Sequence, residues 1–329
     1  MTAAPGPRLM GGPEVRPLRE NDARGVAMLV ADYFAEIGMG QSMSVEQMRQ
    51  LFATSWLEGG AGFVLEHGPE TAGYGFVRPT RWKGADSIQL GLTLKRGYRD
   101  PETYHVLTDQ LLEKGSELAG KHGVRSMSIH LRSIDTVHVP VVLELGFQEH
   151  PVSMLGFRHD LDDVPARPLP QGLTLRCARL PEETPTVLGL SGPAFDDRER
   201  QGEPVTGTYL SFVAGKSGFD PEQVLLVENP DGPVGYTVVD ATSHGKGGCY
   251  GILELGVLPG SRGRGIGSAL VCRVLGWLKE KNARSAVAGM FSSNIAATLF
   301  WRLGFRPDPR RTFRFFVRDL GPSPTVERR

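Results

Sequence analysis

The sequence contains few cysteines, and their number and placement exclude two common uses of that residue. Only Cys177, Cys249 and Cys272 occur among 329 residues. An odd number cannot be fully paired in disulfides, and the three do not have the short spacings of a metal site. We therefore expect reduced thiols, as in a cytoplasmic protein, and no bound metal.

An excess of charge of one sign is also missing, as is any long apolar run. Lysine plus arginine and aspartate plus glutamate each number 37, so charge gives no reason to expect nucleic acid as a partner. No apolar stretch approaches the roughly 20 residues that a membrane helix needs. The first residues, Met1 to Pro7, lack the apolar centre of a signal peptide. We expect a cytoplasmic protein of about two domains with no membrane partner.

Glycine, in contrast, is abundant, and one glycine-rich turn is the most informative segment of the chain. Residues 252–257 are apolar and typical of a strand, and residues 269–278 repeat apolar side chains at helical spacing. Between them lies Arg262-Gly-Arg-Gly-Ile-Gly267. Such a turn points successive backbone N–H groups at one spot, and the helix N-terminus adds roughly half a positive charge. The segment therefore predicts a pyrophosphate site.

Two familiar phosphate loops do not fit this turn. A Walker A loop needs Lys-Ser/Thr after its last glycine, whereas Ile266, Gly267 and Ser268 follow Gly265. A dinucleotide fingerprint needs an acidic residue about 20 positions further on. Residues 286–288, which lie at that distance from the turn, are apolar.

The turn resembles the acyl-CoA-binding turn of the GCN5-related N-acetyltransferases, the GNAT superfamily. In that family a strand ending Val-x-Pro is followed by Arg/Gln-x-x-Gly-x-Gly/Ala. The matching residues are Val257, Pro259, Arg262, Gly265 and Gly267, followed later by Asn294, Ala296, Ala297 and Leu303-Gly304-Phe305. The resemblance covers about residues 173–320, and it implies a GNAT fold with acetyl-CoA as the cosubstrate.

The chain also repeats itself at about half its length. A strand–turn–strand pattern over residues 63–74 recurs over residues 224–236, and Gly73 matches Gly235 at an offset of 162. Leu145-Gly-Phe147 matches Leu303-Gly-Phe305 at 158, and Val15-Arg16 matches Leu175-Arg176 at 160. Three matches at nearly one offset predict two similar domains in tandem.

We therefore predict an α/β (α+β) protein with two tandem GNAT-like domains, similar to the tandem type of mycothiol synthase-like proteins. Each domain is expected to be a mixed, mostly antiparallel sheet flanked by helices. The expected boundaries are 12–160 for the N-terminal domain, 161–170 for a proline-rich linker and 171–320 for the C-terminal domain. Helices are expected over 106–122 and 268–281, and strands over 87–94, 126–131 and 250–257.

The first copy lacks the features that would hold a phosphate. When Gly97-Tyr-Arg99 is laid over Gly260-Ser-Arg262, Glu102 and Tyr104 fall where the second copy has Gly265 and Gly267. Side chains there would obstruct a phosphate, and Pro101 removes one N–H donor. We expect a degenerate first domain that has lost the pyrophosphate site or holds a nucleotide only loosely, keeps a structural role and helps to wall the acceptor pocket.

The resemblance also implies which residues act in the second copy. The strand before the turn is expected to carry a bulge, for which Gly256 is suited, and to splay from its neighbour so that pantetheine can enter. The residues expected to bind the cosubstrate are Leu255, Val257, Arg262, Gly263, Arg264, Gly265, Ile266, Gly267, Ser268 and Asn294. Asn294 has an alternative role as a helix cap.

Acyl transfer to an amine also needs a base and a proton donor. Glu254 is the one carboxylate in its apolar strand, and partial burial would raise its pKa toward values useful for a base; a solvent-facing glutamate is the alternative. Many relatives place a proton-donating tyrosine four residues before the glycine of Leu-Gly-Phe, where this chain has Phe300. A water, Ser292, Ser293 or a substrate hydroxyl could supply the proton.

The leading interpretation is an acetyl-CoA-dependent N-acetyltransferase that acts on a small-molecule amine in its C-terminal domain, as a monomer or a homodimer. Residues 196–200 and Tyr209 are candidates to cover the acceptor. Two alternatives stay open: a CoA-binding protein without catalysis, which Phe300 favours, and an enzyme that transfers or decarboxylates another acyl-CoA.

Overall fold

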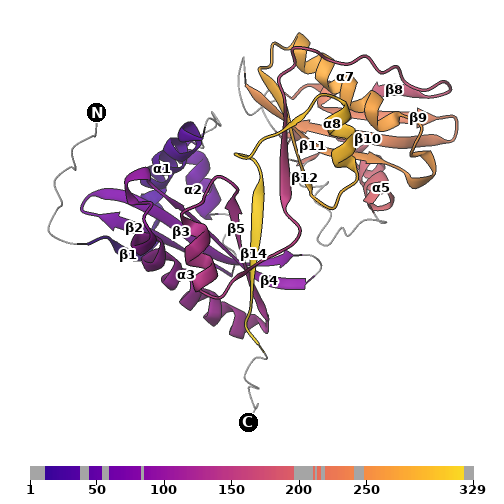
Figure 1. Ribbon diagram of the computed structural model, residues 1–329. Coiled ribbons are helices and arrows are strands. Elements are labelled where there is room, and N and C mark those ends of the chain that lie inside the picture. Colours follow the sequence, from indigo (N-terminus) through magenta and orange to yellow (C-terminus); the bar gives the residue numbers. More distant parts are fainter. Residues whose placement is uncertain are drawn as a thin grey trace.

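The structure is a computed structural model, and it describes residues 12–37, 44–53, 59–82, 85–195, 210–211, 213–215, 219–240 and 248–321. Two lobes lie side by side, each a sheet with helices on its faces (Figure 1). Among these residues, none of the helices combines the length and apolar character that a bilayer span demands.

The N-terminal lobe is built from the first half of the chain. Its strands are β1 (Glu14–Pro17), β2 (Ala61–His67), β3 (Glu70–Trp82), β4 (Ala85–Leu94), β5 (Ser126–Arg132) and β6 (Gln148–Glu149). Its helices are α1 (Ala23–Glu36), α2 (Val45–Ala53), α3 (Pro101–His122) and α4 (His138–Glu144), with short 3-10 turns η1 (Glu20–Asp22) and η3 (Arg96–Tyr98).

The remaining elements lie in the second half of the chain or directly before it. The strands are β7 (Met154–His159), β8 (Thr174–Cys177), β9 (Val224–Asn229), β10 (Gly232–Asp240), β11 (Cys249–Val257), β12 (Ser285–Phe291), β13 (Arg306–Pro307) and β14 (Phe313–Asp319). The helices are α5 (Thr184–Phe195), α7 (Ile266–Glu280) and α8 (Ala296–Arg302), with 3-10 turns η4 (Pro221–Gln223) and η5 (Pro259–Ser261).

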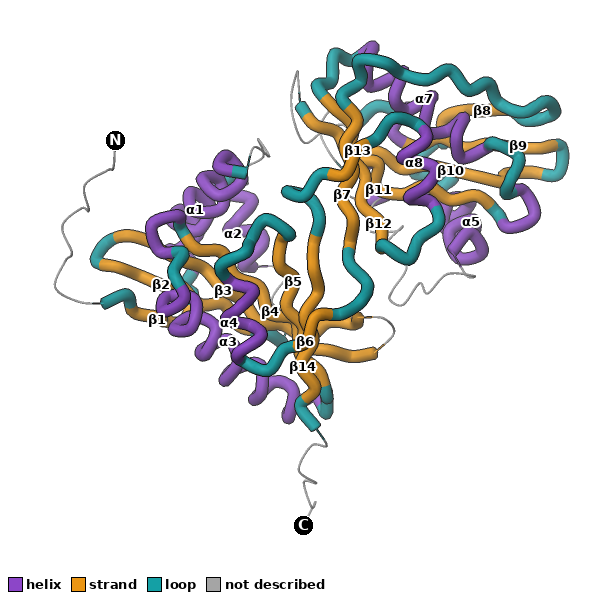
Figure 2. The backbone as a smooth tube through the Cα atoms, viewed as in Figure 1, coloured by secondary structure: helices purple, strands orange, loops and turns teal. Residues whose placement is uncertain are grey.

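All strands belong to one continuous sheet, and its order shows that the two lobes exchange a strand. The order is β1-β2-β3-β4-β5-β14-β7-β12-β11-β10-β9-β8. Strand β14, from the end of the chain, pairs antiparallel with β5 of the N-terminal lobe over its whole length. Strand β7, from the first half, pairs antiparallel with β12 of the C-terminal lobe. Figure 2 shows the exchange as two segments, β14 and β7, that pass between the lobes.

The strand pairing therefore departs from the chain segments expected for each domain. Residues 154–159 lie before the predicted linker but complete the C-terminal sheet. Residues 313–319 lie in the predicted C-terminal domain but complete the N-terminal sheet. Residues 161–170 form neither helix nor strand. The domain boundaries at 12–160 and 171–320 stay a prediction. They do not describe how the strands are divided between the two lobes, because β7 and β14 each pair with the lobe of the other half.

The internal repeat reappears in three dimensions as two matching ion-pair clusters. Arg16, on β1, binds Asp22 and Glu66. Its counterpart Arg176, on β8, binds Glu183 at 2.7 Å and Glu228 at 2.6 Å. The hydrogen bonds from Arg176 and Arg179 lower the pKa of Glu183 to about 2. Both clusters tie the first strand of a lobe to the next strand, as a repeated unit predicts.

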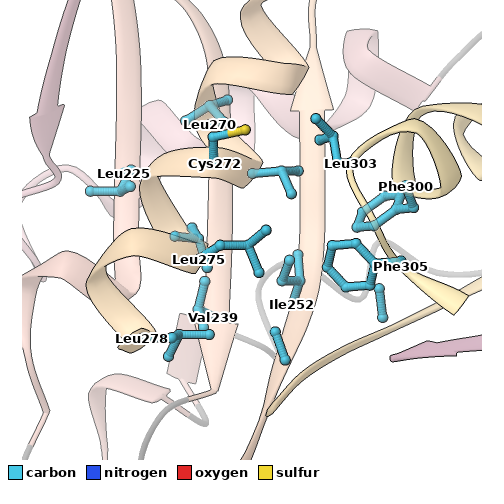
Figure 3. Close-up of a cluster of buried hydrophobic side chains, with 14 of the residues drawn as sticks. Leu225, Val239, Ile252, Leu270, Cys272, Leu275, Leu278, Phe300, Leu303 and Phe305 are labelled. Carbon is cyan, nitrogen blue, oxygen red and sulfur yellow. The ribbon is translucent and has the colours of Figure 1, made fainter. Parts of the chain in front are cut away.

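Each lobe has its own hydrophobic core between the sheet and its longest helix. Helix α3 starts at an N-cap, Asp100, and ends at Gly123 with a positive φ of 66°. In the C-terminal lobe, α7 packs Leu270, Leu275 and Leu278 against β9, β10 and β11, and Phe300 and Phe305 close the cluster (Figure 3). The predicted fold class is confirmed, and the predicted helices over 106–122 and 268–281 correspond to α3, which starts five residues earlier, and α7.

Candidate functional site

Strands β11 and β12 lie parallel and then separate. They pair from Cys249 with Ser285 to Ile252 with Ala288, and no further, although β11 continues to Val257 and β12 to Phe291. Among the strands that the structure describes, the half of β11 with Glu254, Leu255 and Val257 therefore has only β10 as a neighbour. This opening is the splay that the sequence predicts on this strand.

A bulge lies in β11, but not where the sequence analysis places it. Val238 pairs with Glu254 and Val239 with Ile252, so Leu253 is the extra residue. Gly256 pairs regularly with Tyr236, and a Cβ on Gly256 would lie 2.4 Å from the Tyr236 ring. The expectation for Gly256 is thus wrong: a glycine is needed there because the fully buried Tyr236 ring crosses the strand.

The bulge sets the face on which Glu254 lies. Residues directly opposite on paired strands share a face, so Glu254 lies on the face of Val238, which packs in the core under α5. Ile252 lies on the other face, in the core under α7. The Glu254 side chain is 6% exposed, and its main-chain oxygen accepts a hydrogen bond from Thr237 Oγ1 at 2.8 Å. The alternative of a solvent-facing glutamate is therefore wrong.

The glycine-rich turn follows directly and leads into α7. Gly263 and Gly265 have φ of 74° and 88°, a region that glycine enters without strain, and a Cβ at either position would meet nothing within 4 Å. Gly265 is the N-cap of α7, and no side chain of the described residues caps the helix there. The first N–H groups of α7, from Ile266 to Ser268, therefore accept no side-chain cap from the described residues, and they lie at the positive end of a 15-residue helix.

The other residues of the turn hold its shape. Arg262 donates from Nε to the Val257 oxygen at 3.0 Å and from Nη2 to the Ala194 oxygen at 2.9 Å. The Ile266 side chain is buried in the core, so only its backbone reaches the turn. A Cβ on Gly267 would lie 3.3 Å from Leu299 Cδ2, so this glycine allows α7 to approach α8. Arg264 is exposed.

Three further residues, each considered from the sequence for binding or proton transfer, follow β12 or lie on α8. Asn294 follows β12, and its Oδ1 accepts a hydrogen bond from the Ala296 N–H at 2.9 Å, which supports the capping role at the start of α8. Phe300 is 3% exposed and packs edge-on against Phe305 at 5.0 Å between ring centroids. Because Phe300 is part of the core, this position supplies no proton. Ser292 is exposed and its Oγ accepts from the Ser153 N–H at 3.1 Å.

The equivalent turn of the N-terminal lobe differs from the predicted overlay. Arg99 corresponds to Arg262, but α3 has its N-cap at Asp100, one residue later, whereas α7 has its N-cap at Gly265, three residues later. Glu102 and Tyr104 thus lie within α3 and do not occupy the places of Gly265 and Gly267. The first lobe lacks two residues of the turn.

The helix start in that lobe is also occupied by its own side chain. Asp100 accepts hydrogen bonds from the Thr103 N–H at 3.0 Å and from Thr103 Oγ1 at 2.8 Å. Pro101 has no N–H and Glu102 adds a negative charge to the first turn. Residues 196–200 and Tyr209, the candidates to cover an acceptor in the other lobe, lie outside the described residues.

Known proteins similar to this chain agree with the arrangement of a splayed strand pair, a bulge and a glycine turn. Residues 194–305 match the family model described as the acetyltransferase (GNAT) family. This segment is a GNAT acetyltransferase domain. This match supports an acyltransferase activity for the chain, and the strand order shows two lobes of similar architecture.

Relatives and solved structures extend the likeness over most of the chain. The chain is 28% identical to the mycothiol acetyltransferase of Streptomyces scabiei over 297 residues, which cover 89% of this chain and 91% of that protein. It is 26% identical to the mycothiol acetyltransferase of Streptomyces avermitilis, with 81% and 83% covered. A GCN5-related N-acetyltransferase from Sphaerobacter thermophilus superposes with a TM-score of 0.72 at 20% identity, covering 95% and 97%.

A tandem GNAT protein from the clavulanic acid biosynthesis pathway has the same fold. Its TM-score is 0.66 at 17% identity, and 95% of this chain and 100% of that chain are covered. The tandem GNAT architecture predicted from the internal repeat is thus confirmed.

Proposed function

We propose that the chain transfers the acetyl group of acetyl-CoA to the amine of a small molecule, at a site in the GNAT domain. The observation that carries this proposal is the opening between β11 and β12 beside the uncapped start of α7. An extended thiol arm fits between separated strands, and a pyrophosphate fits exposed N–H groups at a helix start.

The residues proposed to hold the cosubstrate divide into two groups. The backbone of Gly263, Gly265 and the first turn of α7, through Ser268, binds the pyrophosphate. The main chain of Leu255 and Val257, free of β12, binds the pantetheine arm and holds the thioester. Arg262 shapes the turn through Val257, and Asn294 orders the start of α8. When bound, acetyl-CoA supplies an activated acetyl group as a thioester.

Glu254 is the proposed base. It is buried beside the bulge on the face that α5 covers, which is the face away from α7. The carboxylate accepts the proton that an attacking amine must lose as the new amide bond forms and the carbon–sulfur bond breaks. The leaving thiolate needs a proton in turn. Since Phe300 is part of the core, that proton comes from water, a serine hydroxyl near residue 292 or the acceptor itself.

The names of the relatives supply the acceptor class. The name mycothiol acetyltransferase refers to a small molecule, and we propose that the acceptor of this chain is also a small molecule. The deciding experiment is steady-state release of free CoA thiol from acetyl-CoA in the presence of a panel of small amines, with the acetylated amine identified by mass spectrometry. Release that depends on an amine supports the proposal. CoA binding without turnover on any amine would support a non-catalytic protein, and turnover only with another acyl-CoA would support a related acyl-CoA enzyme.

A further inference from the structure

The N-terminal lobe contains a cavity of about 510 Å³ where β4 and β5 separate. It lies in the same place within the lobe as the opening between β11 and β12 in the GNAT domain. Its walls include Tyr33 of α1, Leu94 of β4 and Tyr104 of α3. Arg310, from the segment between β13 and β14, closes one side, so the exchanged strand carries a residue of the other half into this cavity.

The cavity does not fit a nucleotide pyrophosphate. The helix start beside it is capped by Asp100, begins with Pro101 and carries Glu102. Two carboxylates and a missing N–H oppose a phosphate at that position. The volume nevertheless lies in the range of small-molecule sites. The ligand must therefore be recognised by the cavity walls themselves.

Asp135 is the polar group in the walls that is best placed to bind a ligand. Its Oδ1 accepts from the His138 N–H at 3.1 Å and from the Tyr104 hydroxyl at 3.4 Å. Within the described part of the chain, its Oδ2 accepts no hydrogen bond and the carboxylate forms no ion pair. Burial raises the pKa of Asp135, an effect that Arg99 and the His138 N–H offset in part. Asp135 is half-buried, and a carboxylate in such a place with one oxygen that accepts no hydrogen bond from the described residues is stabilised by a cation.

The cations already near the cavity are engaged elsewhere. Arg99 forms an ion pair with Glu36 at 2.9 Å, and its Nε donates to the Leu94 oxygen at 2.9 Å. Arg310 pairs with Asp308, also at 2.9 Å. Because Arg99 and Arg310 each pair with another carboxylate, Arg99 compensates the charge of Asp135 only in part. Arg99 already lies over the Tyr33 ring, and the Tyr104 ring stacks on His138, so the attraction for an ammonium group comes from Asp135 and not from these rings.

We propose that this cavity is a second small-molecule site, which binds a ligand through a primary ammonium group placed against Asp135 Oδ2. The apolar walls around Leu94 and Ile134 take the body of the ligand. The N-terminal lobe is then a binding module in its own right, and this site does not depend on catalysis in the GNAT domain.

The test uses the full-length chain and three probes of similar size and different charge: phenethylamine, 2-phenylethanol and 3-phenylpropionate. Saturation-transfer NMR and calorimetric titration measure binding. We expect saturable binding of the amine, with the alcohol and the carboxylate at least about tenfold weaker. Binding of the alcohol or carboxylate as tight as that of the amine, or no binding of the amine, would overturn the proposal.

Variants identify the site. Asp135→Asn keeps an oxygen to accept from His138 and removes the charge, so the fold is preserved and amine binding falls about tenfold or more. Asp109→Asn, an exposed neutralisation on α3, is the matched control and leaves binding unchanged. Ile134→Trp fills the cavity from a partly exposed position and blocks all three probes. Unchanged amine binding in both Asp135→Asn and Ile134→Trp would place the ligand elsewhere.

Discussion

Arg262 donates a hydrogen bond from Nε to the Val257 carbonyl oxygen, across 3.0 Å, at the point where β11 ends. Arg99 makes the same bond to the Leu94 oxygen, across 2.9 Å, where β4 ends. The first lobe keeps this contact although it lacks the glycine turn. The arginine therefore belongs to the common fold of the repeat, where it ties the strand end to the following turn, while the glycines are specific to the lobe with the open helix start.

Substitution of Gly265 tests the phosphate site. Gly265→Glu places a carboxylate in the open space before α7, and we expect CoA binding, one molecule per chain in the parent, to be abolished in calorimetric titration. Gly265→Asn is the matched control, since asparagine tolerates the positive φ better than other residues and adds no charge. It retains measurable binding. Equal affinities for both variants and the parent, or two tight CoA sites in the parent, would contradict the assignment.

Glu254→Gln tests the proposed base. Glutamine keeps the size of the buried side chain and cannot accept the proton, so turnover falls at least roughly tenfold. The affinity for CoA stays at the parent value because the turn is untouched. Both quantities are measured on one preparation, by thiol release and by titration. A variant with near-parent turnover would make Glu254 a structural residue.

Gly256→Ala tests the reason for that glycine. A methyl group would meet the Tyr236 ring at 2.4 Å, so we expect the free energy of unfolding to fall by about 1 to 3 kcal/mol. Gly260→Ala is the control, because a Cβ there meets nothing within 4 Å. Urea unfolding measures both. Equal stabilities would show that the Tyr236 ring moves aside at little cost.

The exchanged strands make a prediction about fragments. Residues 171–329 lack β7 and carry β14 without its partner β5, so we expect this fragment to aggregate. Residues 151–312 contain β7 and omit β14, and they are expected to be soluble and to bind CoA. Size-exclusion chromatography and titration compare the two. A monomeric, active 171–329 fragment would show that the exchange is dispensable.

The buried His138 and the half-buried His130 make the stability of the N-terminal lobe depend on pH. Burial lowers the pKa of His138 to about 3 and that of His130 to about 4. Both rings are thus neutral in the folded chain but protonate near pH 6.5 when unfolded. Their stabilisation is complete above pH 6.5 and is lost as the pH falls toward 4, by at most about 1.4 kcal/mol per pH unit for each.

The measurement for this prediction is urea unfolding at pH 7 and pH 5. His138→Gln removes one of the two titrating rings, so we expect its loss of stability between the two pH values to be smaller than that of the parent by about 1 to 2 kcal/mol. His122→Gln, at the exposed end of α3, controls for the removal of a histidine. A His138→Gln variant with the parent's pH dependence would contradict the assignment.

The sequence was most informative where structure is set by neighbours in the chain. The glycine turn, the hairpins and the helices over α3 and α7 depend on local residue types and spacing. The sequence predicts a bulge on β11 but not its position at Leu253, because the run of apolar residues in this strand looks the same for pairings that differ by one residue. The cavity at Asp135 was missed because its walls come from four distant segments, and an aspartate before a short helix has the pattern of an ordinary cap.

The exchange of strands was not predictable from the sequence for a related reason. Strands β7 and β14 follow equivalent positions of the two repeats, after Leu145-Gly-Phe147 and Leu303-Gly-Phe305. By its pattern of apolar residues, each of these two strands could pair with the edge strand of either lobe. The choice between them depends on the path of the chain in space.

The position of β14 has a consequence for how the chain folds during its synthesis. The sheet of the N-terminal lobe needs residues 313–319 to cover the edge of β5. Those residues leave the ribosome only after residues 194–305 of the GNAT domain. The lobe that is translated first is therefore the last to be completed, and the nascent chain carries an open strand edge throughout translation of its second half.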